Sequence, residues 1–281
     1  MAAEICLLKG SCKLAEAATD MVLSDVADGV MRITLNRPDR ANAIPPESRE
    51  RLVELFAEAD GDVAVRAVLL QSTGKHFCSG ADVSRMSGAL ATPRPTGTTM
   101  RTMLGGAQKL IAAILDCGKP VVAAVQGPAA GMGAHLALAC DLVVAADEAW
   151  FSQPFVLRGL ALDAAGAYLL PRRVGLQKAK ELAFLGDRLT AQDALGLGLV
   201  NRVCAAADLE AEANALTRRL AEGATTAIGL SKRLLNASLD SDRASAFLAE
   251  AMAQEINGKT EDVREGVAAF VEKRPVNFRG Y

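Results

Sequence analysis

Residues 120–141, PVVAAVQGPAAGMGAHLALACD, constrain the fold more than any other part of the chain. Residues 121–125 form a short apolar run, mainly of β-branched residues, which is typical of a strand buried on both faces of a sheet. A helix is predicted to follow, and the glycines between the two let the backbone turn sharply. Such a turn leaves the first amides of the helix, roughly residues 132–135, without partners inside the helix. The sequence therefore predicts a backbone site for an oxygen that carries negative charge.

A second unit of the same kind occurs earlier in the chain. Residues 67–71, AVLLQ, form another buried-strand run, and the segment STGKHFCSGADV after it has Gly74 and Gly80 at a predicted turn. Asp82 would then lie in the first turn of a helix, where the helix dipole favours an acidic side chain. Two such units predict two backbone N–H groups directed at one oxygen, which is the arrangement that stabilises an enolate or a tetrahedral intermediate in acyl chemistry.

Length, charge and cysteine usage exclude several classes of protein. The chain has 281 residues, of which 51% are hydrophobic, enough for one large core or a core with a helical annex. A net charge of -2 gives no basic surface for nucleic acid, and no apolar run approaches the roughly 20 residues needed to cross a bilayer. The cysteines show neither CxxC nor Cys/His spacing, so a zinc site and a disulfide framework are not expected, and a reducing cytoplasm is the expected compartment. They are Cys6, Cys12, Cys78, Cys117, Cys140 and Cys204.

Strand and helix patterns alternate as far as about residue 204, and only helical patterns follow. Residues 87–99 contain two prolines and two glycines without apolar periodicity, so we expect a loop of the kind that often forms a lid. After residue 208, amphipathic stripes begin at Leu209, Phe247 and Val263. The other predicted elements are strands at 30–36, 141–145 and 200–204 and helices at 45–60, 104–115, 175–185 and 190–195.

Four motifs together resemble those of one family. FCSGADV, GPAAGMGAHLALACDLVVAAD, FSQPFVLRGLALDAAGAYLLPRRVG and LTAQDALGLGLVNRV are similar, in order and spacing, to the crotonase superfamily of enoyl-CoA hydratases and isomerases. The resemblance covers about residues 22–278 and looks closest to the ring-epoxide isomerases of phenylacetate degradation and their enoyl-CoA isomerase relatives. It implies an α/β fold, the crotonase-like spiral of ββα units, with a C-terminal helical trimerisation region. We expect an N-terminal extension at 1–20, a spiral core at 21–204 and a helical oligomerisation region at 205–281.

The same resemblance implies the partners of the chain. The substrate would be an acyl-CoA thioester, with no cofactor beyond the coenzyme A that the substrate carries and no metal. Neither nucleic acid nor a membrane is an expected partner, and the chain would assemble as a homotrimer or a dimer of trimers.

Site residues carry over position by position from the family's motifs. The backbone amides of Ala81 and Met132 would form the oxyanion hole. Arg40 could instead be a surface arginine in a tight turn, and Lys273, which in relatives can reach the nucleotide of a neighbouring chain, could instead be a solvated lysine. Cys78 is expected to be a buried packing residue, since neither histidine is placed by the sequence as its base. The residues expected to line the substrate and coenzyme A site are Arg40, Ala41, Ala43, Ser79, Gly80, Asp82, Val83, Gly131, Phe155 and Lys273.

The acid–base residues leave three hypotheses open. Where hydratases of the family carry two glutamates, this chain has His135 and Phe155, and phenylalanine cannot take a proton. Asp163 falls where several isomerases place an acidic residue, although it could also be the N-cap of the next helix. An isomerase that uses Asp163 is favoured. The alternatives are an atypical hydratase in which His135 and Asp163 share a water, and an acyl-CoA binding protein without activity. His135 could also be a structural, hydrogen-bonded residue.

Overall fold

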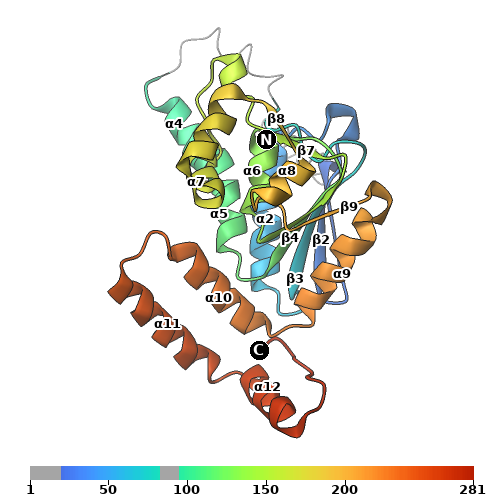
Figure 1. Cartoon of the computed structure of the whole chain (residues 1–281), viewed down its shortest axis with the longest axis vertical. Helices are drawn as coiled ribbons and strands as arrows, with labels where there is room; N and C mark the ends of the chain where they lie inside the picture. The colour runs from blue at the N-terminus through green and yellow to red at the C-terminus, as the bar shows by residue number, and fades with distance from the viewer. Residues whose placement is uncertain (1–19, 83–94) are drawn as a thin grey trace, which may run out of the picture.

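A six-stranded sheet forms the centre of the fold in the computed structural model, which describes residues 20–82 and 95–281 (Figure 1). The strand order is β1-β2-β3-β4-β6-β9, with β1 antiparallel to β2 and every other pair parallel. The two runs predicted as buried strands are the central pair, β3 and β4. The strands are β1 (Val22–Ala27), β2 (Val30–Leu35), β3 (Ala67–Ser72), β4 (Val121–Val125), β6 (Leu142–Ala146) and β9 (Arg202–Cys204).

Helices cover both faces of this sheet, as the apolar character of the strands requires. On one face, Leu70 packs in a common core with Leu52 of α2 (Pro46–Gly61), with α5 (Lys109–Asp116) and with α6 (Met132–Ala139). On the other face, Leu69 packs in a second core with Leu216 of α9 (Leu209–Ala221). Neighbouring residues of one strand therefore contribute to different cores.

The first strand is an element that the sequence analysis does not predict. Only Val22 of β1 is buried, so the strand lacks the alternation that marks a half-buried strand. Asp28 and Gly29 join β1 to β2, and both have positive φ angles, of 51° and 76°. A two-residue Asp-Gly turn is a strong hairpin signal, so this connection was readable from the sequence.

A small second sheet and a long kinked helix were also not predicted as such. The sheet contains β5 (Ala129–Ala130), β7 (Trp150–Ser152) and β8 (Arg188–Thr190). The helix predicted at 175–185 is the second half of α7 (Gly166–Leu185), which kinks at Gly175, where φ is 74°. The predicted cap of α8 (Ala191–Gly196) is present, because the Thr190 hydroxyl accepts a hydrogen bond of 3.1 Å from the Asp193 amide.

The segment predicted as one helix at 104–115 is divided. It consists of a π-helical turn η3 (Leu104–Gln108) and α5, and both continue without a break from α4 (Thr98–Met103). The predicted lid at 87–99 lies largely outside the described residues, as do the extension at 1–19, Cys6, Cys12 and Val83.

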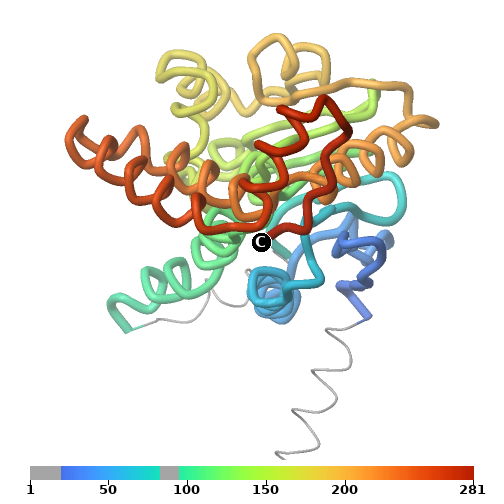
Figure 2. Tube along the Cα trace, turned by 90° about the horizontal axis from the view of Figure 1, so that it is seen from below, coloured from blue at the N-terminus to red at the C-terminus, as the bar shows by residue number. Residues whose placement is uncertain are grey.

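Beyond α9 the chain forms a helical arm that extends away from the core. The arm contains α10 (Thr225–Ala237), α11 (Arg243–Asn257) and α12 (Glu261–Glu272), and α10 was not predicted. Figures 1 and 2 both show the α10–α11 hairpin projecting sideways, and Figure 1 shows α12 at the end of the molecule opposite α4. In the part of the chain that the structure describes, no helix is long and apolar enough to cross a membrane.

Candidate active site

The two glycine turns lie against each other. Cys78, in the turn after β3, forms a parallel bridge with Ala129, in the turn after β4. The Cys78 amide donates to the Pro128 carbonyl (3.1 Å), and the Ala130 amide donates to the Cys78 carbonyl (2.9 Å). A side chain at Gly133 would overlap the Cys78 carbonyl oxygen, so only glycine permits this approach.

This contact brings the amides of Ala81 and Met132 to the same place. A Cβ atom built on Gly80 would lie 3.5 Å from the Met132 nitrogen. Since three covalent bonds separate that atom from the Ala81 nitrogen, the two nitrogens are no more than about 7 Å apart. The Ile44 amide donates to the Gly80 carbonyl, and the Asp82 amide donates to the Ile44 carbonyl. Because these two bonds flank Ala81, the N–H of Ala81 points away from Ile44. Among the described residues, neither the Ala81 nor the Met132 N–H donates a hydrogen bond.

The loop before α2 is fixed to the first glycine turn by one buried asparagine. Asn42, with φ of 53°, donates from its amide to the carbonyls of Thr73 and His76, each at 2.8 Å. Its side-chain oxygen accepts from the Arg37 amide at 2.7 Å, and Arg37 forms an ion pair of 3.0 Å with Asp82. This network holds the loop 37–44 beside residues 78–82.

Five of the residues predicted to line the substrate and coenzyme A site lie together. Ala41, Ala43, Ser79, Gly80 and Asp82 lie in the two joined loops, and the Ser79 amide donates to the Ala41 carbonyl at 3.0 Å. The expectation for Asp82 was wrong in one respect, because it lies outside any helix and pairs with Arg37 instead.

Two other predicted residues, Arg40 and Lys273, have exposed side chains. The Arg40 side chain is exposed at the edge of its loop and lies 3.7 Å from the Asp39 carboxylate. Lys273 follows α12 at the far end of the helical arm, where it is exposed.

His135 is fully enclosed beside the Met132 amide. Its side chain has 0% exposure, and its ring lies parallel to that of Phe155, with centroids 5.8 Å apart. The Phe155 ring also lies over Gly131, and a side chain at Gly166 would overlap the histidine ring. Neither ring nitrogen of His135 makes a hydrogen bond of good geometry, although the Gln153 side chain and the Ala164 and Asp163 carbonyls lie close to the ring.

Burial keeps this histidine neutral. Loss of hydration lowers the pKa of His135 to about 4, against the opposing effect of the nearby Gln153 side chain and of the Ala164 and Asp163 carbonyls. At neutral pH the ring therefore carries no charge, and one of its nitrogens can accept a hydrogen bond.

Asp163 lies in the loop before α7, on the side of this ring stack. Its carboxyl group is half-buried, and burial raises its pKa, which the positive charge of Arg49 partly offsets. The alternative of an N-cap is not observed, because Ala165 occupies the cap position of α7 and no side chain caps this helix end. Ala164 and Ala165 have φ angles of 46° and 61°, a strained pair of the kind that clusters at functional sites.

Cys78 is a packing residue, as its place in the turn predicts. Burial raises the pKa of its thiol to about 12, so the thiol carries no charge at neutral pH and is a poor nucleophile. Within residues 20–82 and 95–281, no group of three or more His, Cys, Asp and Glu side chains could hold a metal ion.

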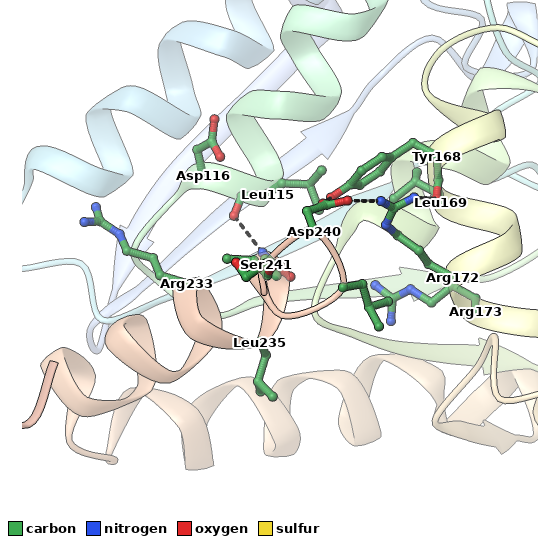
Figure 3. A pocket seen from close by; sticks show the side chains of 13 residues that line it. Leu115, Asp116, Tyr168, Leu169, Arg172, Arg173, Arg233, Leu235, Asp240 and Ser241 are labelled. Atoms are coloured by element: carbon green, nitrogen blue, oxygen red, sulfur yellow. Dashed lines mark hydrogen bonds and ion pairs between the residues drawn. The ribbon is translucent and has the colours of Figure 1, made fainter. Parts of the chain in front are cut away.

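A separate cavity of about 730 Å³ lies between α5, α7 and α10 (Figure 3). The Arg172 guanidinium lies 3.6 Å from the centre of the Tyr168 ring and pairs with Asp240. None of the residues that line this cavity belongs to the predicted site.

Two polar side chains near the site were missed by the sequence analysis. Arg49 and Gln153 each have a buried polar atom without a hydrogen-bond partner, Nε and Oε1 respectively. Gln153 left no signal in the sequence. Arg49 is detectable in the sequence, because it precedes Leu52 and Phe56 by three and seven residues and so falls on the apolar stripe of α2.

Comparison with known proteins gives a consistent picture. The sequence model of the family described as Enoyl-CoA hydratase/isomerase matches residues 25–281. The 1,2-epoxyphenylacetyl-CoA isomerase of Escherichia coli is 36% identical over 262 residues, covering 93% of this chain and 99% of that protein. The short-chain-enoyl-CoA hydratase of Clostridium acetobutylicum is 33% identical over 252 residues, 87% of this chain and 92% of that one. A solved enoyl-CoA hydratase/isomerase from Cupriavidus metallidurans superposes with a TM-score of 0.86 at 35% identity, over 93% of this chain and 97% of that one.

Proposed function

The chain belongs to the enoyl-CoA hydratase/isomerase family of acyl-CoA enzymes, and we propose that within this family it is a double-bond isomerase that uses Asp163 as its proton shuttle. The expected fold class, α/β with the crotonase-like spiral and a C-terminal helical region, is confirmed by the superposition on solved members. The reaction, the residues that perform it and the assembly are proposals.

The thioester carbonyl would bind between the amides of Ala81 and Met132. As the enolate forms, negative charge moves onto this oxygen, and each preorganised donor stabilises it by about 3 kcal/mol. The proposal is supported by the separation of the two nitrogens, which is at most about 7 Å, and by the absence of other acceptors for them among the described residues. Coenzyme A would lie along the joined loops at 37–44 and 78–82.

The Asp163 carboxylate would remove a proton from one carbon of the acyl chain. The electron pair of the broken C–H bond moves into the enolate, and the double bond shifts as the protonated Asp163 returns the proton to another carbon. A half-buried carboxyl with a raised pKa suits both steps, because it is a stronger base than an exposed carboxylate and holds the proton long enough to return it.

One observation carries the choice of an isomerase. The position where the family's hydratases have a second glutamate is Phe155, and its ring lies against Gly131 and parallel to His135. An apolar ring at this place cannot hold or deprotonate a water, whereas a single carboxylate is enough for proton transfer between two carbons.

A second candidate, an atypical hydratase, is favoured by the buried nitrogens of His135. A neutral imidazole without a protein partner could accept a hydrogen bond from a water that Asp163 also holds. The oxygen of that water would then bond to the β-carbon as Asp163 takes its proton, and the protonated Asp163 would deliver this proton to the α-carbon as the enolate collapses.

Two substrates separate these functions. With a 3-enoyl-CoA, isomerisation produces the absorbance of a conjugated double bond, and with crotonyl-CoA, hydration removes it. Asp163→Asn should lower isomerisation at least about a hundredfold with little change in affinity for the thioester. The matched control is Asp147→Asn, an exposed turn aspartate after β6. Wild-type rates in Asp163→Asn would refute the proton shuttle, and thermal stabilisation by acyl-CoA without either reaction would indicate a binding protein.

For the assembly we propose a homotrimer or a dimer of trimers formed through the helical arm. Apolar side chains of α11 are exposed at helical spacing, including Phe247 (63%), Met252 (57%) and Ile256 (56%), and Phe270 of α12 is 86% exposed. Faces of this kind are typical of interaction surfaces. In such an assembly Lys273 could reach the coenzyme A of a neighbouring subunit, and light scattering of the purified protein gives the number of chains.

A further inference from the structure

On the buried stripe of α2, the Nε atom of Arg49 has no hydrogen-bond acceptor among the described residues. Arg49 is half-buried, and its Nε atom has no contact with solvent and no hydrogen-bond acceptor. The residues that share its stripe, Leu52 and Phe56, are each 1% exposed. Burying a polar donor costs free energy unless the donor is satisfied, so this N–H is expected to have an acceptor when the protein works.

Arg49 lies close to the proposed oxyanion hole along the chain and in space. The start of α2 is joined to the first glycine turn, because the Ile44 amide donates to the Gly80 carbonyl at 2.8 Å. Arg49 lies in the first turn of α2, which begins at Pro46, two residues after Ile44. An acyl chain that leaves the thioester carbonyl therefore needs only a few carbon atoms to come within reach of this side chain.

The guanidinium faces the π-helical turn and not solvent alone. A Cβ atom built on Gly106 of η3 would lie 3.6 Å from the Cζ atom of Arg49, while one built on Gly105 would meet nothing within 4 Å. Gly106 thus leaves the place of a side chain unfilled beside the guanidinium.

The same charge acts on the proposed base without bonding to it. Arg49 opposes the rise in the pKa of Asp163, and it does so through space, with no hydrogen bond between the two side chains. The carboxyl and the guanidinium therefore lie near each other and leave the donors of Arg49 unused.

We propose that Arg49 determines specificity by donating a hydrogen bond to an oxygen atom in the acyl group of the substrate. The preferred substrates are then acyl-CoA thioesters whose acyl chain carries an oxygen, as a carbonyl or as a carboxylate. Arginine has donors and no acceptor, so it distinguishes such a chain from a hydrocarbon chain. This inference rests on the proposed acyl-CoA site, and the test below separates the two.

The test uses matched, saturated CoA thioesters, which bind without reacting. For chains of four to eight carbons, calorimetry compares the plain acyl-CoA, the same chain with a ketone oxygen near its end, and the same chain ending in a carboxylate. For at least one length the wild-type protein should bind an oxygenated thioester about tenfold more tightly than the plain one. Preference for the ketone as well as the carboxylate indicates a neutral oxygen acceptor, and preference for the carboxylate alone indicates an anion.

Variants at position 49 test whether Arg49 causes the preference for oxygenated acyl chains. Arg49→Met should abolish it and Arg49→Lys should retain part, while affinity for the plain thioester stays within about twofold. The matched control is Arg51→Met, because Arg51 lies on the same helix but is bonded to Glu54 and Glu58.

Failure of the inference differs from failure of the proposed function. If the wild-type protein isomerises a plain 3-enoyl-CoA but prefers no oxygenated chain at any length, the inference is wrong and the function stands. If no acyl-CoA binds, both are wrong. If Arg49→Met shifts the pH profile equally for plain and oxygenated substrates and leaves their affinity ratio unchanged, Arg49 only adjusts the pKa of Asp163 and the inference is also wrong.

Discussion

Replacing Lys232 by methionine should destabilise the protein, because this lysine fastens the helical arm to the central sheet. Its ammonium group lies 2.9 Å from the Asp141 carboxylate and donates to the carbonyls of Ile114 (3.0 Å) and Lys119 (3.3 Å). The same Asp141 oxygen accepts from the amide of Val121, the first residue of β4. Lys232→Met keeps about the length of the aliphatic side chain and removes the ion pair and both hydrogen bonds of the ammonium group.

The size of the effect follows from burial. Removing one partner of a fully buried ion pair costs about 3–5 kcal/mol, because the other charge is left uncompensated. The side chains of Lys232 and Asp141 are 5% and 25% exposed, so water screens the remaining carboxylate in part. We therefore expect a loss in the free energy of unfolding near the lower limit, about 3 kcal/mol.

The loss should depend on pH in a defined direction. Burial raises the pKa of Asp141 even with Lys232 present, and removal of the lysine raises it further. A carboxyl with a raised pKa lowers stability as the pH rises through that pKa, because the charged form is the disfavoured one. The deficit of Lys232→Met should thus be largest at pH 8 and should shrink as the pH falls toward the ordinary aspartate value of 3.8.

Urea unfolding followed by circular dichroism measures the effect. The wild type, Lys232→Met, Asp141→Asn and the double variant are compared at pH 8 and pH 5, at one fixed protein concentration because assembly adds to apparent stability. The double variant should be more stable than the sum of the single effects predicts, by at least about 1 kcal/mol. Additive effects, or a deficit that is the same at both pH values, would refute this account of the pair.

Three further outcomes are expected. Gly133→Ala should prevent folding or lower the melting temperature strongly, because the added methyl group overlaps the Cys78 carbonyl. The control Gly196→Ala, whose methyl group would have no atom within 4 Å, should leave the melting temperature unchanged. Calorimetry measures both melting temperatures. On the acidic side, kcat/KM should fall as the pH drops through the raised pKa of Asp163. His135→Asn should leave the pH of this fall unchanged, because His135 is neutral at these pH values. An inflection near pH 6.5 that His135→Asn removes would contradict a neutral histidine. The Cys78 thiol, with a pKa of about 12, should resist alkylation by iodoacetamide at pH 8 in the native protein. Mass spectrometry measures the modified fraction, and rapid modification of Cys78 would contradict its burial.

The elements that were predicted correctly have strong local signals. The strands at 67–71 and 121–125 are uninterrupted apolar runs because both of their faces are covered, and α2 has a proline start and an apolar stripe. β1 lacks such a signal because it lies at the edge of the sheet. The strands of the small sheet have only two or three residues, too few to show a period.

Less of the site could be predicted, because it depends on contacts between distant segments. The glycine turns indicated two donors, but their side-by-side placement comes from the bridge between Cys78 and Ala129, which no local pattern encodes. Asp163 looked like a helix cap because aspartate often is one; the left-handed alanines after it move the helix start to Gly166. Arg49 was overlooked because a charged residue on an apolar stripe was not treated as a signal.

The spacing of the Ala81 and Met132 amides is determined by main-chain atoms alone. The residues proposed to move protons would act through their side chains instead: His135 lies on α6, which begins at Met132, and Asp163 lies in the loop before α7. Exchanging those side chains can therefore alter the reaction without disturbing the cradle for the thioester oxygen. Relatives named as a hydratase and as an isomerase both match this chain over most of its length, as expected of a fold whose oxyanion donors need no particular side chain.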